Sequence, residues 1–288
     1  MIIEVCATSA NLKYGFDCLG MALSLYNKFT VEPHDGLLID GVEPQYNNRD
    51  NLFCVGYNTI MKKLGEDDHY DYHVTFDTNI PISRGLGSSA SLLVAGALAA
   101  NKMHGERLST DEVFAACVEL EGHPDNVSPA IYGGVTVGYY DGKSIINMPI
   151  NIDPHIKACV LIPDVHVSTE EARRILPSHY TFAEAKHALS RAMIFIQLLS
   201  SSKYEEIKSI PEDEIHEKYR RTLIPDFDEV RSMCYEKGCF SFMISGSGST
   251  CLALSDDPHF SRKLDMSGYS SNWQVMDLEI PSDGYRIY

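Results

Sequence analysis

Apolar and polar residues alternate along the chain in patterns that predict strands and helices in its first half. Residues 73–77 alternate between polar and apolar side chains, as a half-buried strand does. Residues 88–104 are apolar and rich in alanine and predict a helix. A second helix is predicted from Thr110 to about Glu121, with Ser109 or Thr110 as its N-cap. Further strands are predicted at 2–7, at 19–32 and within 132–140. The first of these runs into a loop at 8–17, and the last follows a glycine turn.

The second half repeats this mixture after a polar stretch at 149–155, which contains two prolines and is the best candidate for a linker. Capping boxes at 168–171 and 181–184 open two helices, and the second helix is expected to continue to about Leu199. Strands are predicted at 157–163 and on both sides of a glycine loop within 241–254. Blocks of strands and helices in both halves predict an α+β fold in two parts.

The composition is that of a globular protein with an acidic surface. The 288 residues are 44% hydrophobic and 22% charged, and the chain is long enough for one large or two modest domains. The net charge of −16 argues against nucleic acid as a partner, because a phosphate backbone requires concentrated positive charge. A nucleotide would have to be bound locally, by backbone amides, a few cations and a metal ion.

The eight cysteines include no C-x-x-C pair, and most lie in apolar surroundings. We therefore expect reduced, buried thiols rather than disulfides or a zinc site. The N-terminus lacks the basic and apolar regions of a signal peptide, and no run approaches 18 apolar residues. These features predict a cytoplasmic protein that does not associate with membranes.

The stretch 81–91, with the sequence PISRGLGSSAS, is the most informative one in the chain. Gly85 and Gly87 allow a ligand to approach the backbone closely, and the apolar run that follows predicts a helix whose first N–H groups face the loop. Together with the helix dipole and the hydroxyls of Ser88 and Ser89, this arrangement favours a polyphosphate. It matches neither G-x-x-x-x-G-K-[ST] nor G-x-G-x-x-G, and the alternative is an ordinary strand–turn–helix connection with a serine cap.

The stretch 121–126, EGHPDN, places two carboxylates, an imidazole and an amide within six residues. Phosphoryl transfer to an alcohol needs a metal ion and a group that orients or deprotonates the hydroxyl. Glu121 together with hydroxyl groups would suit Mg²⁺, and Asp125 could act on the proton. Alternatively, the stretch is a polar turn in which Pro124 stops the helix, Asp125 makes an Asx turn and His123 is structural.

Two arginine pairs, 173–174 and 220–221, offer anchors for a small carboxylate, although each could be a solvated surface charge. We interpret Arg174 and Arg221 as surface charges. The loop 245–250, SGSGST, lies between two apolar runs and would allow close backbone approach to a ligand or to the loop 81–91. A simple hairpin turn is the alternative for this loop.

Together these stretches resemble the GHMP kinase superfamily, and within it the homoserine kinases. Residues 7–20, 81–91 and 244–250 resemble the three superfamily motifs, in the right order. Two further stretches narrow the resemblance to the homoserine kinases: EGHPDNVSPAIYGG at 121–134, and EARRILP at 171–177 together with RRTLIP at 220–225. The resemblance covers essentially the whole chain.

The resemblance implies a binding site for ATP phosphates and Mg²⁺. The phosphate-binding residues would be Pro81, Ile82, Ser83, Arg84, Gly85, Leu86, Gly87, Ser88, Ser89, Ala90 and Ser91. Either Ser88 or Ser89, with Ser89 preferred, would lie at the metal together with Glu121; Glu119 is the alternative if the alignment shifts by two residues. The third glycine loop would contribute Gly246, Ser247 and Gly248.

The resemblance also implies a site for the amino acid substrate. Its residues would be Asn11, Asp17, His123, Thr169, Arg173 and Arg220. Asp17 and Asn11 suit an ammonium and a hydroxyl, and the arginines suit a carboxylate. Asp125 matches the candidate base and Asn11 is grouped with it as catalytic, although positioning and charge stabilisation alone could support the transfer.

Lys13-Tyr14 replaces the usual Gly-Pro, and Ser249 replaces a usual proline. Neither change removes a polar group assigned to the chemistry.

The implied fold has an N-terminal α+β nucleotide-binding domain, residues 1–153, and a C-terminal ferredoxin-like α/β sandwich, residues 154–288. The active site would lie between them. The implied reaction is the ATP-dependent phosphorylation of L-homoserine, a step toward threonine, by a homodimer. A kinase for another small alcohol, such as mevalonate or galactose, and a non-catalytic binding protein of the same fold are the alternatives.

Overall fold

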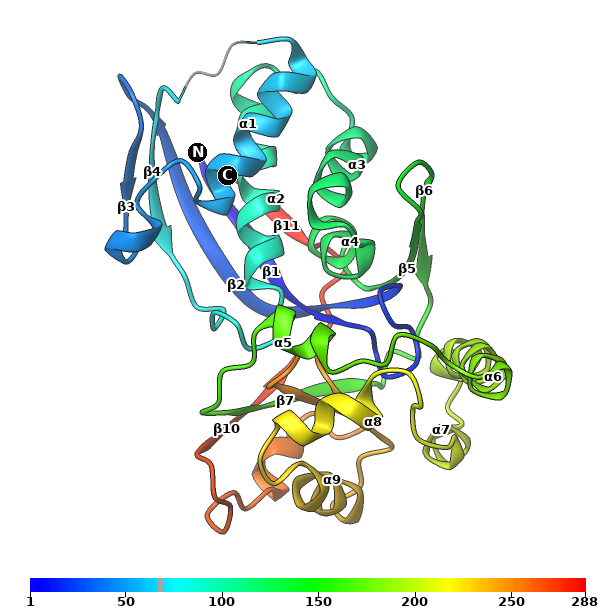
Figure 1. The fold of residues 1–288 in the computed structure, drawn as a ribbon. Coiled ribbons are helices and arrows are strands. Elements are labelled where there is room, and N and C mark those ends of the chain that lie inside the picture. Colours follow the sequence, from blue (N-terminus) through cyan, green and yellow to red (C-terminus); the bar gives the residue numbers. More distant parts are fainter. Residues whose placement is uncertain (67–69) are drawn as a thin grey trace.

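The computed structural model describes residues 1–66 and 70–288, which form two sheets with helices (Figure 1). The N-terminal sheet has the strand order β11-β1-β2-β4-β3, with β5 pairing to β2 and β6 pairing to β5. Its strands are β1 (Ile2–Ala10), β2 (Leu19–Pro33), β3 (Leu38–Asp40), β4 (Tyr72–Asp77), β5 (Val135–Tyr140), β6 (Ile145–Ile150) and β11 (Tyr285–Ile287). The pairs are antiparallel except β3–β4.

Four helices cover one face of this sheet (Figure 1). They are α1 (Leu52–Leu64), α2 (Ser88–Met103), α3 (Thr110–Glu121) and α4 (Pro124–Tyr132), and a short 3-10 helix, η1 (Pro44–Tyr46), precedes them. Apolar side chains from the sheet and the helices, such as Phe29, Phe53 and Tyr72, form a closed core between the two layers. Burial of this apolar surface is the main force that holds the helices on the sheet.

The C-terminal sheet has the antiparallel order β10-β7-β9-β8. Its strands are β7 (Lys157–Pro163), β8 (Ser241–Ile244), β9 (Cys251–Ser255) and β10 (Trp273–Leu278). With the strands numbered along the chain this order is 4-1-3-2, that of a ferredoxin-like sheet, so the expected fold of this half is confirmed. The helices are α5 (Thr169–Arg174), α6 (Phe182–Leu199), α7 (Tyr204–Ser209), α8 (Glu217–Arg220) and α9 (Phe227–Glu236), with the 3-10 helices η2 (Arg221–Leu223) and η3 (Phe260–Lys263).

Strand β7 is buried on both faces because alternate side chains enter two different cores. Cys159 and Leu161 pack against α9, whereas Ala158, Val160 and Ile162 pack into a core shared with the first half. That shared core includes Leu12 and Leu86, so both candidate ligand loops are anchored in it.

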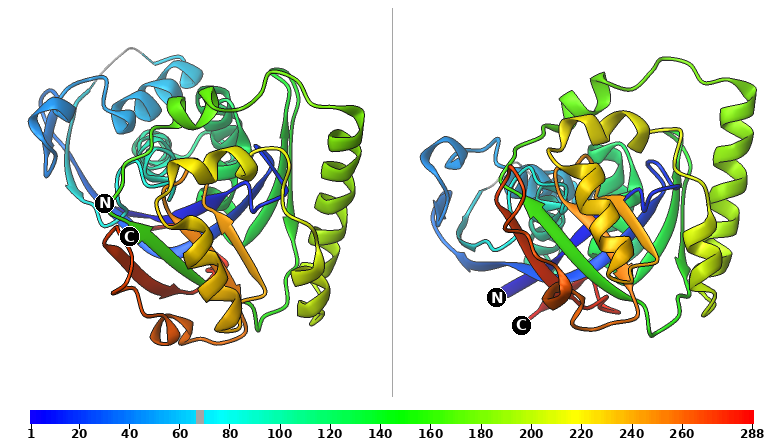
Figure 2. Two further views of the ribbon diagram at one scale, coloured as in Figure 1. Left: turned by 60° about the horizontal axis from the view of Figure 1, so that its bottom comes forward. Right: turned by 90° about the horizontal axis from the view of Figure 1, so that it is seen from below.

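The ends of the chain meet on the N-terminal sheet. Strand β11 pairs with β1, and the N–H of Ile2 donates to the carbonyl of Tyr288 at 3.0 Å (Figure 2). The final residues of the predicted 154–288 domain therefore add a strand to the first sheet. Along the described ranges, no helix combines the length and the apolar character needed to cross a membrane.

Most predicted elements are present, including 157–163, the helix ending at Leu199, and the helix 110–121 with its Ser109 cap. One predicted boundary was wrong, and part of one alternative interpretation is excluded. Strand β1 continues to Ala10 instead of ending at 7. Pro124 does not stop a helix: α3 ends at Glu121 with Gly122 as its C-cap, and Pro124 is the first residue of α4, where its missing N–H costs nothing.

Candidate active site

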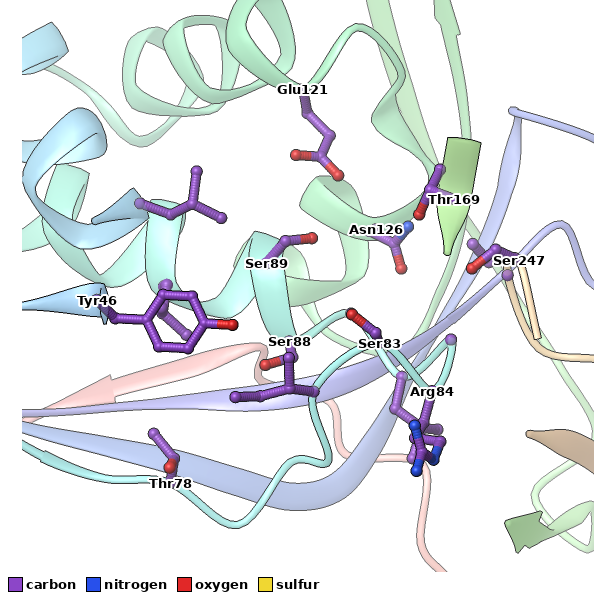
Figure 3. A pocket seen from close by; sticks show the side chains of 18 of the residues that line it. Tyr46, Thr78, Ser83, Arg84, Ser88, Ser89, Glu121, Asn126, Thr169 and Ser247 are labelled. Atoms are coloured by element: carbon purple, nitrogen blue, oxygen red, sulfur yellow. The ribbon is translucent and has the colours of Figure 1, made fainter. Parts of the chain in front are cut away.

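A cavity of about 680 Å³ opens between the two halves of the protein, and almost every predicted site residue lines it. The predicted residues that line it are Asn11, Asp17, Ile82, Ser83, Arg84, Gly85, Leu86, Gly87, Ser88, Ser89, Glu121, His123, Asp125, Thr169, Arg173, Arg220, Gly246 and Ser247. The floor of the cavity is the start of α2, as Figure 3 shows for Ser88 and Ser89. Groups far apart in the sequence thus meet at one hollow.

The loop before α2 is shaped to leave the helix N-terminus open. Gly87 is the N-cap residue and has left-handed backbone geometry (φ 68°), and no side chain caps the helix. The first N–H groups of a 16-residue helix therefore point into the cavity without an intrahelical acceptor. A Cβ atom on Gly87 would lie 1.9 Å from the Thr8 hydroxyl, so this turn requires glycine.

Three hydrogen bonds, one from Thr8 and two from the loop 245–250, hold this loop in place. The N–H of Thr8 donates to the carbonyl of Leu86 at 3.1 Å, and the N–H of Thr250 donates to the carbonyl of Arg84 at 3.1 Å. The Ser245 hydroxyl donates to the Gly85 carbonyl at 2.6 Å. The third glycine loop is a hairpin between β8 and β9, and it also packs against the loop 81–91.

Side chains that carry oxygen atoms surround the N-terminus of α2. Glu121, from the end of α3, points toward Ser89 and Asn126 (Figure 3). Burial raises the pKa of Glu121, an effect that a nearby cation would offset. Glu119 does not line this cavity and pairs with Lys63 at 3.0 Å on the surface.

His123 and Asp125 form a pair at the start of α4. The His123 Nδ1 lies 2.7 Å from the Asp125 Oδ1, and Asp125 is buried. Burial disfavours a charged imidazole, but the hydrogen bond and charge of Asp125 outweigh this effect and raise the pKa of His123. One oxygen of Asp17 lies within 4.8 Å of ligand atoms of this pair.

Charged groups from both halves meet at the opposite end of the cavity. Arg173 binds Asp17 through two parallel hydrogen bonds of 2.8 and 3.0 Å. Arg220 is buried, and its Nε and Nη1 donate to the carbonyls of Ala172 and Gly246. Burial and the nearby Arg173 lower the pKa of Arg220 to about 10. The positive charge of Arg220 is therefore not fully balanced by its surroundings and would favour a bound carboxylate.

Asn11 orients this end of the site. Its Nδ2 donates to the Gly246 carbonyl, and its Oδ1 accepts from the N–H of Asp17, both at 2.9 Å. Both ends of the amide are therefore bonded within the protein. Among the predicted residues, Pro81, Ala90, Ser91 and Gly248 do not line the cavity, and Ser91 is buried against Asn27.

The sequence interpretation missed one wall of the cavity. It consists of the segment before α1 and nearby side chains, namely Gly41, Val42, Glu43, Gln45, Tyr46, Asn48, Asp50, Asn51, Leu52, Phe76, Thr78 and Leu92. Ala10 also lines the cavity, as does Asn126, whose amide belongs to the stretch 121–126 and lies near Thr169 (Figure 3). Figure 3 shows Tyr46 and Thr78 on this side of the pocket. The segment before α1 has no glycine-rich pattern, and only the fold brings it close to the loop 81–91.

Comparison with known proteins decides the family. The profile of the GHMP kinases N terminal domain matches residues 51–134, and that of the GHMP kinases C terminal matches residues 195–263. A homoserine kinase from Clostridium beijerinckii is 37% identical, over 99% of this chain and 97% of its own. One from Clostridium botulinum strain Alaska E43 is 36% identical, over 98% and 96%. The chain belongs to the homoserine kinases of the GHMP kinase family.

Solved structures agree with the fold of this homoserine kinase family member. The homoserine kinase from Cytophaga hutchinsonii superposes with a TM-score of 0.90 at 24% identity, over 99% of this chain and 96% of its own. A putative homoserine kinase from Listeria monocytogenes gives 0.80 at 27% identity, over 100% and 98%. Mevalonate kinase from L. major shares the fold at 0.71 with 14% identity, over 96% and 95%. The two-part GHMP kinase fold predicted from the motifs is confirmed.

Proposed function

We propose that this protein transfers the γ-phosphoryl group of ATP to the side-chain hydroxyl of L-homoserine, a step of threonine biosynthesis. The observation that supports this best is one shared cavity: the uncapped N-terminus of α2 faces the same hollow as Asp17, Arg173 and Arg220. The first feature suits a polyphosphate and the second an amino acid zwitterion. The hydroxyl oxygen forms a bond to the γ-phosphorus, the bond from that phosphorus to the β-phosphate oxygen breaks, and ADP leaves.

ATP lies with its phosphates at the loop 81–91. The free N–H groups of α2 and the helix dipole stabilise the phosphate oxygens. The wall missed by the sequence interpretation supplies a place for the base, because Val42, Tyr46, Leu52 and Ile82 offer apolar surface there. This part of the cavity is where we place adenine.

Magnesium fits the oxygen ligands at the start of α2. Glu121 provides a carboxylate and Ser89 a hydroxyl on the same side of the cavity, the hard oxygen donors that Mg²⁺ prefers (Figure 3). When bound, the ion neutralises charge that builds up on the phosphate oxygens. The position of Glu121 in the cavity and of Glu119 outside it supports Glu121 as the ligand.

Homoserine binds between the arginines and Asp17. Its carboxylate exchanges places with Asp17 on Arg173 and also meets Arg220, while its ammonium takes over Asp17. The pair between Asp17 and Arg173 is partly exposed, and such pairs contribute little net stability, so the exchange costs little. Asn11 fixes the backbone of Asp17, and Asp125, held by His123, accepts the hydroxyl proton.

The alternatives differ in what the cavity would need. A kinase for mevalonate or galactose has no use for an ammonium site beside two arginines. A binding protein without catalysis would not need Glu121, the serines and the glycines together, and all are present here.

Coupled ADP release with homoserine, serine, threonine and mevalonate side by side tests the assignment. We expect turnover with homoserine to exceed that with mevalonate by orders of magnitude. Equal or faster turnover with mevalonate would reject the substrate, and no turnover with any acceptor would support the binding protein.

A homodimer is the assembly that we propose. Helix α6 exposes Phe182, Leu189, Met193 and Ile194, each more than half accessible, and the edge strand β6 on the same side exposes Ile146 and Met148 (Figures 1 and 2). A second copy would cover this apolar face. Sedimentation should give a dimer that Met193→Asp disrupts, whereas a monomer at all concentrations would reject the proposal.

The eight free cysteines support the predicted reducing location, the cytoplasm.

A further inference from the structure

The turn between β1 and β2 has a backbone that its own sequence does not favour. Asn11, Leu12, Lys13 and Asp17 all have left-handed backbone geometry, with φ between 41° and 71°. Each such residue other than glycine costs roughly 1 kcal/mol, so the surroundings must hold the turn in this shape. Asn11 and Asp17 are the residues through which this turn reaches the substrate end of the cavity.

The groups that hold the turn come from the C-terminal half. The Lys13 ammonium is almost fully buried, lies 3.1 Å from the Glu212 carboxylate and donates to the Tyr235 hydroxyl at 3.4 Å. The Lys13 carbonyl accepts from the Nε2 of His216 at 2.9 Å. The next residue, Tyr14, donates from its hydroxyl to the Pro211 carbonyl at 3.0 Å.

The charge of Lys13 is compensated from two sides. Burial opposes the charged form, but Glu217, Tyr14, Tyr235 and Glu212 outweigh it and raise the pKa of Lys13. Removing an ammonium from such a site leaves buried or half-buried partners without compensation.

The same segment also places the arginine of the substrate end. Glu217 and Arg220 are the first and last residues of α8. Glu217 accepts from the N–H of Ile244, at the end of the strand before the third glycine loop, at 2.6 Å. Arg220 and Asn11 both donate to the Gly246 carbonyl in that loop. The turn, α8 and the glycine loop are thus joined on both sides of the substrate end.

We propose that the Lys13 ammonium is a positioning group for the amino acid substrate: it locks the 11–17 turn to the 210–217 segment and thereby sets Asp17 and Asn11 against Arg220. Lys13 does not line the cavity, so it acts through these residues and not on the substrate itself. This inference rests on the proposed function, because it assumes that homoserine binds at Asp17 and Arg220.

Two substitutions separate the ammonium from the strained backbone. Lys13→Met removes the charge and keeps the strain, whereas Lys13→Gly removes both. Lys237→Met, at an exposed lysine of the C-terminal half, is the control for loss of a lysine charge elsewhere. Each variant is compared with the wild-type protein by the KM for homoserine, the KM for ATP, kcat and the melting temperature.

Lys13→Met should raise the KM for homoserine about tenfold, equivalent to ~1.4 kcal/mol of lost binding, with the KM for ATP and kcat changed less than about twofold. Lys13→Gly should raise the KM for homoserine similarly. Glu212→Gln should act in the same direction with a smaller effect, and Lys237→Met should change none of these values.

A lower melting temperature with an unchanged KM for homoserine would overturn the inference, because Lys13 would then only stabilise the fold. Equal rises in both KM values would also overturn it. If the wild-type protein does not phosphorylate homoserine, the proposed function fails instead, and the two failures are distinguished.

Discussion

Arg173 and Arg220 lie at the same end of the cavity but hold different partners. Arg173 is half exposed and binds the carboxylate of Asp17, whereas Arg220 is buried and donates to two backbone carbonyls. Sequence motifs suggested both residues, together with Glu121, Asp17 and Asn11, because each lies in a local pattern. They could not show that Asn11 is bonded at both ends of its amide, since Gly246 lies 235 residues away.

Arg220→Ala should raise the KM for homoserine about 100-fold, equivalent to ~2.8 kcal/mol, and leave the KM for ATP nearly unchanged. The reason is that Arg220 faces the substrate end and not the phosphate loop. Steady-state kinetics with each substrate varied in turn measures this. Arg221→Ala is the control, because the Arg221 side chain pairs with Asp228 on the surface. Unaltered homoserine kinetics would remove Arg220 from the site.

Glu121→Gln should lower kcat about 100-fold and increase the Mg²⁺ concentration needed for half-maximal rate, because it removes a charged metal ligand. Glu119→Gln should do neither, since Glu119 lies outside the cavity. Magnesium titrations of the rate test both variants. If Glu119→Gln shows the loss and Glu121→Gln does not, the metal assignment is wrong by two residues.

His123 should make stability depend on pH. The pKa of His123 in the folded protein is raised above the ordinary value of 6.5. The stabilisation from the pair of charged His123 with Asp125 is therefore fully present below pH 6.5 and is lost as the pH rises through the folded-state pKa. Burial also raises the pKa of Glu217 to about 8, so Glu217 makes stability fall with rising pH in the same direction. This contribution of Glu217 is the same in the wild-type protein and in a His123 variant. The melting temperature of His123→Gln should therefore fall less steeply between about pH 6 and 8 than that of the wild-type protein. Parallel curves would contradict the charged pair with Asp125.

At the scale of elements, the start of α2 determines the site. Its position was predicted from the sequence, because glycines, hydroxyls and an apolar run mark a helix N-terminus within a few residues. Helix α4 was missed because proline ends one helix or begins another equally well, and the local sequence does not distinguish the two. The segment before α1 was missed because its role depends on distant strands that bring it to the cavity.

Gly87→Ala tests the open helix terminus. A Cβ atom at Gly87 would lie 1.9 Å from the Thr8 hydroxyl, so the turn must shift. The first N–H groups of α2 would then no longer point into the cavity. We expect ATP affinity to fall at least about tenfold by calorimetry. Gly105→Ala, beyond the far end of α2, is the matched control, because its φ is also positive (84°) and nothing lies near the new Cβ. Gly105→Ala should lose about 1 kcal/mol of stability and keep ATP binding, whereas Gly87→Ala should lose more stability, because of the clash, together with ATP binding. Equal ATP affinities would show that the terminus does not bind phosphate.

At the scale of the whole molecule, one shared core joins the two halves. Residues of β1, β2, β7 and β9 pack in it, and β11 returns from the C-terminal half to the first sheet. The two-part fold could be predicted from the motifs. The pairing of β11 with the first sheet could not, because a strand of three residues gives no recognisable sequence pattern. This shared core places the proposed phosphate site and the proposed amino acid site in one cavity.

A crystal structure with a non-hydrolysable ATP analogue, Mg²⁺ and homoserine tests this account most directly. The account predicts the triphosphate at the N-terminus of α2, the ion between it and Glu121, and the homoserine hydroxyl facing the γ-phosphate with its carboxylate on the arginines. A nucleotide bound elsewhere, or homoserine away from Asp17 and Arg220, would contradict it.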